Sequence, residues 1–174
     1  MNKIAVIGVG SWATSLAILL DNNNVQVVLW SYSKSVCQEI NETKKRKRLP
    51  GIILPDRLTA STDLKAVVTD AELVVVCMPS QYLNNVVAQL GSYLTNQPIM
   101  CLIKGLLQEE SPFISDFFKR HCPQSDYALL SGPNLAHEIA EKKPAAAVVG
   151  SHSIELANKI QGYLSQDLFR VYTS

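Results

Sequence analysis

A glycine-rich segment directly after the first apolar run constrains the fold of this chain more than any other feature. Residues 3–7 read Lys-Ile-Ala-Val-Ile and predict a buried strand, and residues 8–13 read Gly-Val-Gly-Ser-Trp-Ala, which matches the pattern G-x-G-x-x-A. Apolar residues then recur at helical spacing over 12–20 until the polar run 21–24. The segment therefore predicts a tight strand-to-helix turn at the start of a parallel α/β sheet.

The same turn has the features of an anion site. Gly8 permits the sharp reversal of the chain, and Gly10 carries no side chain that would keep a diphosphate away from the backbone. The following helix begins near Ser11 and Trp12, and its first amide groups lie at the positive end of the helix dipole. We predict a bound dinucleotide here. The alternative is that these glycines only form a structural turn between the strand and the helix, with no bound ligand.

The rest of the chain alternates between strand-like and helix-like segments, which is typical of parallel βαβ units. We predict about seven strands, mostly parallel, in one doubly wound α/β domain over 1–174, with helices between most of them. The basic run 44–48, followed by Pro50 and Pro55, predicts an extended loop. Expected strands lie at 3–7, 25–30, 73–77, 98–103, 127–130, 145–149 and 169–172, and expected helices at 12–20, 33–43, 83–94, 112–120 and 154–164.

Composition excludes several classes of protein. Hydrophobic residues make up 47% of the chain and charged residues 18%, which excludes a disordered protein. The net charge of +1 supplies no general field for nucleic acid or an anionic membrane, and the basic run 44–48 has no interleaved aromatic residues. We interpret that run as solvated surface charge. The first apolar run, 4–7, is too short for a signal peptide or a membrane span, so we expect a cytoplasmic protein.

No metal site is expected. The cysteines have irregular spacing without a C-x-x-C pair, which favours buried, reduced thiols over disulfides or metal ligands. His137-Glu138 does not extend to a zinc motif because the residue four beyond His137 is Glu141. The four cysteines are Cys37, Cys77, Cys101 and Cys122.

The end of the second expected strand bears on the choice of cofactor. A carboxylate about 20 residues beyond the glycine pattern usually binds the adenosine ribose of NAD. Residues 30–34 read Trp-Ser-Tyr-Ser-Lys, so no acid stands there to repel a 2′-phosphate, and Lys34 could attract one. We predict NAD or NADP, with a lean towards NADP. The alternative is that Lys34 is an ordinary solvated residue at a helix start.

Ligands of open α/β sheets collect at the carboxyl ends of the strands, and three polar segments follow strands here. They are 78–80, 104–105 and 131–134. Lys104 is the only charge between 98 and 107, and an ammonium group there suits a phosphate or hydroxyl of a substrate. The segment 131–134 suggests a helix start whose free amides could hold an anion. A lysine reaching water and an ordinary helix cap are the alternatives.

Taken together and in order, these motifs resemble the N-terminal domain of NAD(P)-dependent glycerol-3-phosphate dehydrogenase. The resemblance covers residue 3 to the end of the chain. It implies a Rossmann-type domain and reversible hydride transfer between NAD(P)H and dihydroxyacetone phosphate or glycerol 3-phosphate, a step that supplies the phospholipid backbone. The motifs are Gly-Val-Gly-Ser-Trp at 8–12, Leu-Pro-Gly-Ile-Ile-Leu-Pro at 49–55, Met-Pro-Ser at 78–80, Lys-Gly at 104–105, Ser-Gly-Pro at 131–133 with Ala136 and Glu138, and Arg-Val-Tyr-Thr-Ser at 170–174.

The resemblance also assigns site residues by position. It implies that Lys104 contacts both cofactor and substrate, and that Gly132 and Asn134 contact the substrate. Three positions depart from the family: Ala13 replaces a glycine, Tyr32 an arginine or similar residue, and Asn134-Leu135 a Ser or Thr followed by an aromatic residue. The implied cofactor-binding residues are Gly8, Gly10, Ser11, Trp12, Tyr32, Lys104 and Ala136.

The family continues beyond the Tyr-Thr-Ser segment into a helical domain that bears the catalytic lysine and most of the substrate phosphate site. The resemblance thus implies that this chain is a truncated form or fragment without catalytic residues, inactive alone, whose parent enzyme is a homodimer. Two alternatives remain: a non-catalytic NAD(P)-sensing module, and the cofactor domain of another two-domain dehydrogenase acting on a hydroxy acid or sugar phosphate. The Ser-Gly-Pro and Lys-Gly motifs argue against the second.

Overall fold

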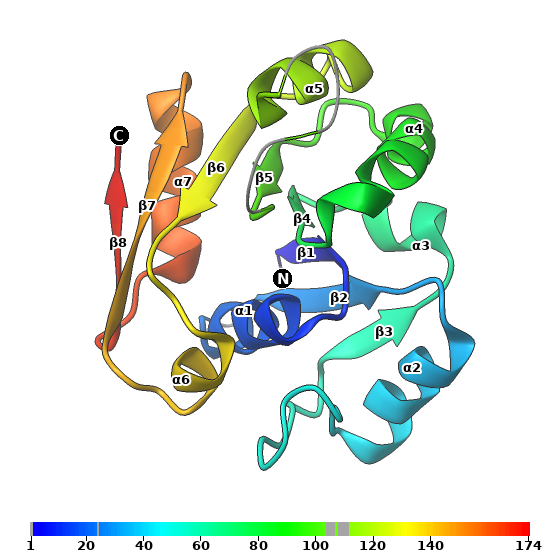
Figure 1. The fold of residues 1–174 in the computed structure, drawn as a ribbon, viewed down its shortest axis with the longest axis vertical. Helices are drawn as coiled ribbons and strands as arrows, with labels where there is room; N and C mark the ends of the chain where they lie inside the picture. The colour runs from blue at the N-terminus through cyan, green and yellow to red at the C-terminus, as the bar shows by residue number, and fades with distance from the viewer. Residues whose placement is uncertain (1, 24, 104–106, 108–111) are drawn as a thin grey trace.

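One sheet organises the chain, and helices cover both of its faces (Figure 1). The computed structural model describes residues 2–23, 25–103, 107 and 112–174. The strands of these ranges are β1 Lys3–Ile7, β2 Gln26–Trp30, β3 Thr59–Ser61, β4 Leu73–Val76, β5 Ile99–Cys101, β6 Tyr127–Ser131, β7 Ala145–Ser151 and β8 Phe169–Thr173. The helices are α1 Ser11–Asn22, α2 Lys34–Gln38, the π-helix η1 Glu39–Thr43, α3 Leu64–Val68, the 3-10 helix η2 Ser80–Tyr82, α4 Leu83–Tyr93, α5 Ile114–His121, α6 Ala136–Ala140 and α7 Ile154–Leu164. None of these described helices has the length and apolar character needed to cross a bilayer.

The order of the eight described strands is β3-β2-β1-β4-β5-β6-β7-β8. Strand β1 pairs in parallel with β2 on one side and with β4 on the other, so the direction of winding reverses at β1. Every neighbouring pair is parallel except β6 and β7, where Leu130 lies opposite Val149. The predicted doubly wound, mostly parallel sheet is confirmed, and its winding reverses at the strand that precedes the glycine turn.

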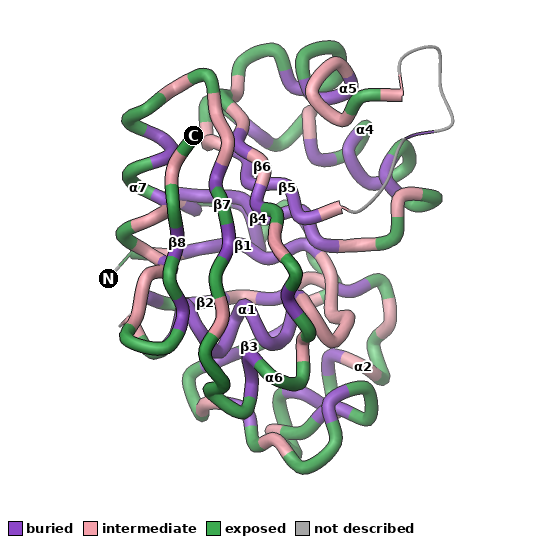
Figure 2. The backbone as a smooth tube through the Cα atoms, turned by 60° about the vertical axis from the view of Figure 1, so that its left-hand side comes forward, coloured by how far each residue is buried: buried purple, intermediate pink, exposed green. Residues whose placement is uncertain are grey.

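The two faces of the sheet form two separate cores. Ile4 and Val6 of β1 pack into a cluster with α1 and α7, whereas Ala5 and Ile7 pack into a second cluster with α3, α4 and α5. Figure 2 shows the inner strands as buried and many of the connecting loops as exposed. Burial on both faces explains why these strands have continuous apolar runs instead of alternating ones.

The prediction lacked strand β3 and helix α3, which both lie between the proline loop and β4. Strand β3 has only three residues, Thr59–Ser61, and pairs in parallel with β2 at the edge of the sheet. Helix α3 follows, with the Asp63 side chain accepting from the Ala66 N–H at its start. A strand of three residues is too short to show a hydrophobic period in the sequence. It forms a strand because it pairs with β2, and not because of its own residues.

The region predicted as one helix, 33–43, divides into two kinds of helix. Helix α2 ends at Gln38, and the wider π-helix η1 continues to Thr43, after which Lys44 has a left-handed φ of 52°. The extended loop expected after it is present, but the interpretation of the run 44–48 as solvated is wrong at one position. Arg46 is buried, because its charge is paired inside the loop with Glu39.

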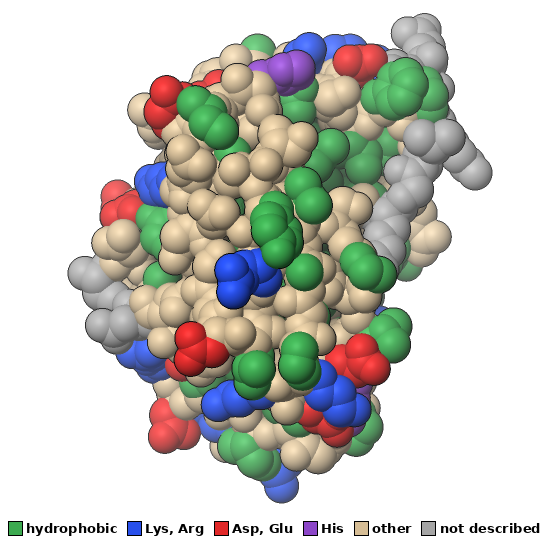
Figure 3. Space-filling model, turned by 90° about the vertical axis from the view of Figure 1, so that its left-hand side faces the viewer, with side chains coloured by type: hydrophobic (Ala, Val, Ile, Leu, Met, Phe, Trp, Pro, Cys, Tyr) green, Lys and Arg blue, Asp and Glu red, His purple; other side chains and the backbone are tan. Residues whose placement is uncertain are grey.

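The far edge of the sheet is more exposed than its centre. On β7 and β8, Val148 is 43% exposed and Tyr172 is 56% exposed, while Val149 and Val171 on the opposite face are buried. Figure 3 shows the side of the molecule that carries β8: backbone and uncharged polar atoms occupy most of its middle, with separate hydrophobic side chains and a basic side chain among them. The sheet is thus covered on both faces at β1 and β4 and on one face at its β8 edge.

Candidate dinucleotide-binding site

The glycine turn joins β1 to α1 at the point where the sheet changes direction. The Gly8 N–H donates to the Trp30 carbonyl at 3.1 Å, and Gly8 has a φ of 132°. A Cβ placed on Gly8 would lie 2.1 Å from the Cys77 carbonyl oxygen. Gly8 therefore has two structural reasons to be glycine, its left-handed conformation and its contact with the end of β4.

Gly10 differs from Gly8, because neither its conformation nor its neighbours require a glycine. Its φ of −67° and ψ of 169° suit any residue, and a Cβ placed there would meet no described atom within 4 Å. Gly10 is the N-cap of α1 and supplies no side-chain acceptor to the helix, whose first turn also contains no acid. The turn thus presents open space in front of an uncapped helix start, a geometry that suits a diphosphate.

Two hydrogen bonds connect the first turn of α1 to other parts of the chain. The Ser11 hydroxyl donates to the Arg48 carbonyl at 2.7 Å, so the basic loop lies against the glycine turn. One turn further along, the buried Ser15 hydroxyl donates to the carbonyl of Ala136 at 2.6 Å, which attaches α6 to α1. Ala136 is therefore held beside α1, as a cofactor position would require. Sequence reasoning missed Ser15 because a serine within an apolar helix gives no signal of its partner.

A cavity of about 410 Å³ brings three of the predicted site residues together. Trp12, Gly132 and Asn134 all line it, although more than a hundred residues separate Trp12 from the other two in sequence. The ends of β5 and β6 form the rest of the wall. The cavity lies at the carboxyl ends of the strands, where ligands of such sheets bind. The remaining lining residues are Cys101, Leu102, Ile103, Ile114, Leu129, Leu130 and Ser131.

Asn134 lines this cavity, and one of its side-chain atoms has no hydrogen-bond partner among the described residues. The residue is 9% exposed, and its Oδ1 has no hydrogen-bond partner in the described part of the chain. Gly132 allows it to approach, since a Cβ on Gly132 would lie 2.6 Å from Asn134 Nδ2. A buried carbonyl oxygen without a partner costs about 1 to 3 kcal/mol. Because this oxygen is buried, a ligand hydroxyl in the cavity would satisfy it only after the Asn134 side chain turns towards the cavity.

The segment 131–134 does not begin a helix, which corrects the sequence interpretation. Helix α6 starts at Ala136 after an extended Leu135, and no side chain caps it. Instead, the Asn134 N–H donates to the Gly132 carbonyl at 2.9 Å, which closes a tight turn directly after β6. Pro133 therefore serves this turn, and the explanation of the segment as an ordinary helix cap is wrong.

The segment that follows β2 carries two exposed side chains at positions that bear on the choice of cofactor. Tyr32 is 81% exposed and Lys34 is exposed, while the Ser33 side chain caps α2 by accepting from the Val36 N–H. Both exposed side chains follow β2, whose last carbonyl accepts from Gly8 at the glycine turn. Lys104, predicted to contact both cofactor and substrate, lies outside the described residues.

The cysteines are free and buried, as predicted. Burial raises the pKa of the Cys101 thiol to about 12 and that of Cys122 to about 11. Cys101 is one of the residues that line the cavity, and its buried thiol, which packs with α4 and α5, stays neutral at physiological pH. In the described ranges, no three His, Cys, Asp or Glu side chains gather as a metal ion would require.

His137 and its neighbours form a surface ion-pair group. Glu141 Oε1 lies 3.2 Å from His137 Nδ1, and Glu141 Oε2 lies 2.9 Å from Lys143 Nζ. The hydrogen bond from Lys143 lowers the pKa of the Glu141 carboxyl. His137 Nε2 also lies 3.3 Å from the Pro50 carbonyl oxygen. These exposed contacts agree with the solvated helix face that the sequence suggested.

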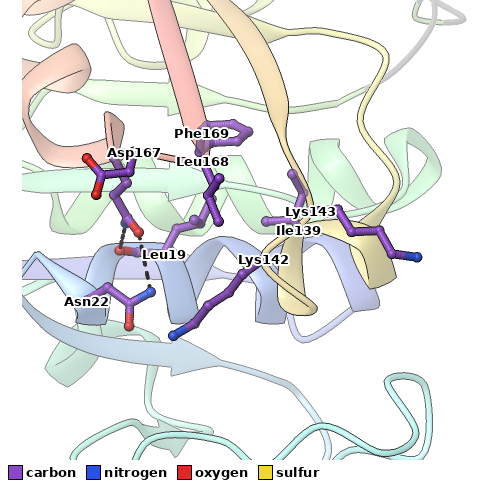
Figure 4. A pocket seen from close by; sticks show the side chains of 9 residues that line it. Leu19, Asn22, Ile139, Lys142, Lys143, Asp167, Leu168 and Phe169 are labelled. Carbon is purple, nitrogen blue, oxygen red and sulfur yellow. Dashed lines mark hydrogen bonds between the residues drawn. The ribbon is translucent and has the colours of Figure 1, made fainter.

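A second cavity, of about 310 Å³, lies at the other end of α1 (Figure 4). Leu19 and Asn22 of α1, Ile139 of α6 and the chain leading into β8 line it. The figure shows Lys142 and Lys143 leaving it in different directions, so their ammonium groups do not converge. None of the predicted site residues lines this cavity, and we place the candidate site at the glycine turn.

A doubly wound sheet with a glycine turn between β1 and α1 defines a Rossmann-type domain of the class used by NAD(P)-dependent oxidoreductases. The sequence profile of the family described as NAD-dependent glycerol-3-phosphate dehydrogenase N-terminus matches residues 3–157. The chain belongs to this family.

Individual relatives agree with this assignment. The chain is 34% identical over its full length to a glycerol-3-phosphate dehydrogenase (NAD(P)+) of Bacillus licheniformis, covering 52% of that protein. It is 35% identical to the enzyme of the same name from Acinetobacter baumannii, with 99% of this chain covering 48% of that one. The crystal structure of glycerol-3-phosphate dehydrogenase from Coxiella burnetii superposes with a TM-score of 0.94 at 28% identity, over 99% of this chain and 54% of that one. The chain thus spans about half the length of the relatives it matches.

Proposed function

We propose that this chain binds NADP or NAD at the glycine turn, as the cofactor half of a glycerol-3-phosphate dehydrogenase. One observation carries the proposal most strongly: open space lies in front of Gly10, at the uncapped start of α1. A diphosphate placed there would accept from free backbone amides at the positive end of the helix. Family membership over residues 3–157 supports the same function.

The proposed cofactor residues surround this turn. Gly8 shapes it, Gly10 leaves room for the diphosphate, and Ser11 and Trp12 begin the helix that faces it. We place Tyr32 beside the adenosine ribose and Ala136 beside the nicotinamide half. Lys104, by position in the family, belongs to the same set.

We favour NADP over NAD as the tighter ligand. The segment that follows β2 contains no carboxylate between Trp30 and Gln38, and Lys34 in that segment is exposed. A 2′-phosphate would therefore meet a cation and no anion. The measurement that decides is the ratio of the two dissociation constants, and a chain that binds NADH tenfold more tightly than NADPH would contradict this preference.

The cavity beside Trp12 is the proposed substrate position. Dihydroxyacetone phosphate and glycerol 3-phosphate both carry a hydroxyl group that could donate to Asn134 Oδ1, whose partner is missing in the described structure. Gly132 lies next to it and completes the proposed substrate contacts. The bound nicotinamide would supply hydride to the carbonyl carbon. We expect the proton for the oxygen to come from a group outside these cavity residues, because burial raises the pKa of Cys101 to about 12 and makes its thiol a weak acid.

Three wider proposals follow from family membership. The parent enzyme is a cytoplasmic homodimer, residues 1–174 fold as one domain, and turnover requires residues beyond those of this chain. One unfolding transition in calorimetry would support the single domain.

Cofactor titration and an activity assay test the proposed function together. We expect the chain to bind NADPH by calorimetry but to show negligible NADPH oxidation with dihydroxyacetone phosphate. Absence of NADPH and NADH binding would overturn the cofactor role. Robust turnover by this chain alone would overturn the claim that it lacks the catalytic group.

A further inference from the structure

One arginine of the basic loop is buried against the glycine turn. The Arg46 side chain is 6% exposed, and its Nη1 donates to Glu39 Oε2 at 2.7 Å. Its Nη2 donates to the carbonyl oxygen of Val9 at 3.0 Å, and Val9 is the residue between the two glycines. Arg46 therefore connects η1 to the middle of the turn.

Glu39 is itself held in place. Its second carboxylate oxygen, Oε1, accepts from the Lys47 N–H at 2.9 Å, so both oxygens are bonded within one short loop. Its own carbonyl accepts from the Thr43 hydroxyl at 2.6 Å. The guanidinium group thus has a carboxylate of fixed position on one side and a backbone carbonyl on the other.

The turn is bonded to the loop on both sides of Gly10. The Arg46 bond to Val9 precedes it, and the bond from the Ser11 hydroxyl to the Arg48 carbonyl follows it. The loop therefore orients the Val9–Gly10 peptide through its carbonyl and holds the side chain of the first residue of α1. The Val9–Gly10 peptide carries the Gly10 N–H, one of the amides that would meet a diphosphate.

The local backbone is unusual in a way that agrees with a functional role. Glu39 begins a π-helix, a form found mainly at functional sites, and the helix ends at a left-handed Lys44. Arg46 Nε is buried without a partner in the described residues. A buried ion pair with an unsatisfied donor is a poor source of stability, so stability alone does not account for the arrangement.

We infer that Glu39 and Arg46 are positioning residues of the cofactor site, which hold the Val9 peptide so that the turn keeps the shape a diphosphate requires. Arg46 is too buried to contact the ligand itself, so it acts through Val9. The inference rests on the proposed function and adds to it two residues that no other part of the proposed site includes.

The chain contains a matched control at the opposite end of α1. Arg57 also bonds one carboxylate and one carbonyl, in this case both from Asp21. Arg57→Met removes the same kind of interaction as Arg46→Met, far from the glycine turn. A change that follows only Arg46→Met is therefore specific to the turn.

The test measures dissociation constants for NADPH and for ADP-ribose, which retains the diphosphate, in wild type, Glu39→Gln, Arg46→Met and Arg57→Met. We expect both variants of the pair to bind at least about tenfold more weakly, the scale on which supporting residues act, and Arg57→Met to bind as wild type does. Melting temperatures of all four proteins accompany the titrations. A purely structural role would lower the melting temperature of Arg46→Met and Arg57→Met while leaving both dissociation constants unchanged.

Glu39→Gln distinguishes a positioning role of Arg46 from a direct electrostatic effect of its charge on the bound diphosphate. The substitution removes a negative charge near the turn but keeps the shape of the side chain. If Arg46 acted through its charge alone, Glu39→Gln would tighten binding, and that result would overturn the inference. Equal binding by wild type and Glu39→Gln would also overturn it while leaving the proposed function intact. A wild type that bound neither NADPH, NADH nor ADP-ribose would overturn the proposed function and this inference together.

Discussion

The two ends of α1 are held by similar interactions but have different surroundings. An arginine from the long loop bonds a carboxylate and a backbone carbonyl at each end: Arg46 at the glycine turn and Arg57 at the last turn of the helix. At the C-terminal end, further side chains join α1 to distant parts of the chain. At the N-terminal end, the space in front of Gly10 is open.

The C-terminal end is closed by amide side chains. Gln166 Nε2 donates to the Leu19 carbonyl at 2.6 Å, and Asn23 Nδ2 donates to the Tyr163 carbonyl at 2.6 Å (the Gln166 bond is drawn in Figure 4). The first bond reaches a carbonyl in the last turn of α1 and the second a carbonyl in the last turn of α7, where the carbonyls of a helix lack partners within it. The N-terminal amides have no equivalent side-chain cap, because Gly10 has none to offer. The comparison suggests that one end of α1 serves stability and the other serves binding.

The largest effect is expected at Gly8, where the turn is structural. Gly8→Ala would place a Cβ 2.1 Å from the Cys77 carbonyl oxygen, in a backbone conformation with a φ of 132° that alanine disfavours. We expect the free energy of unfolding to fall by more than about 3 kcal/mol. Denaturation by urea measures it. A variant within about 0.5 kcal/mol of wild type would show that β1 and β4 can separate without cost.

The next largest effect is expected at Gly10, on binding and not on stability. Gly10→Val adds a branched side chain to open space, so the fold should tolerate it, while the proposed diphosphate would meet its methyl groups. We expect the affinity for NADPH to fall by about a hundredfold or more, equivalent to about 2.7 kcal/mol. Calorimetry at constant salt gives the affinity, with Gly10→Ala as an intermediate case. Unchanged affinity would remove the glycine turn from the binding site.

The converse experiment concerns Gln166 at the closed end. Gln166→Ala removes the bond to the Leu19 carbonyl and the contact with Asn22 Nδ2 at 3.4 Å. We expect the free energy of unfolding to fall by about 1 to 2 kcal/mol, since each net hydrogen bond contributes about 1 kcal/mol. The dissociation constant for NADPH should not change. Weaker binding in this variant would mean that the two ends of α1 are coupled, contrary to the comparison.

The central sheet and the glycine turn were predictable because their residues carry a local signal. Apolar runs such as Leu73–Val76 belong to strands buried on both faces, and the glycine pattern follows the first of them directly. Strand β3 was not predictable, because its three residues are a strand only through β2. Strand β7 was predicted at 145–149, but its antiparallel direction was not, because that direction depends on the turn after β6.

The site was predictable only where a motif or the family resemblance indicated it. Gly132 and Asn134 were expected near a substrate, and the structure places them on one cavity with Trp12. Arg46 was read as a solvated cation, since a run of basic residues gives no sign that one of them is paired and buried. Its partner Glu39 lies seven residues earlier, at the start of a π-helix. No periodic pattern in the sequence predicts that helix, so the pairing could not be predicted either.

The smallest effect is expected from the Cys101 thiol, and it tests whether water reaches the core at the end of β5, behind the face of the sheet that α1 covers. Burial raises the pKa of Cys101 from 9.0 to about 12, so the folded chain retains this proton when the unfolded chain has lost it. The stability contributed by the neutral thiol is therefore complete below pH 9 and declines as the pH rises from 9 towards 12, by up to about 1.4 kcal/mol per pH unit.

Cys101→Ala isolates that contribution, because every other titrating group remains. We expect the free energy of unfolding of wild type to decrease more steeply between pH 9 and pH 10.5 than that of the variant, while the two slopes agree between pH 6 and pH 8. Bound NADPH should not change the direction of this pH dependence, since the thiol packs on the face of the sheet opposite α1. Equal slopes above pH 9 would mean that water reaches Cys101 in the folded chain.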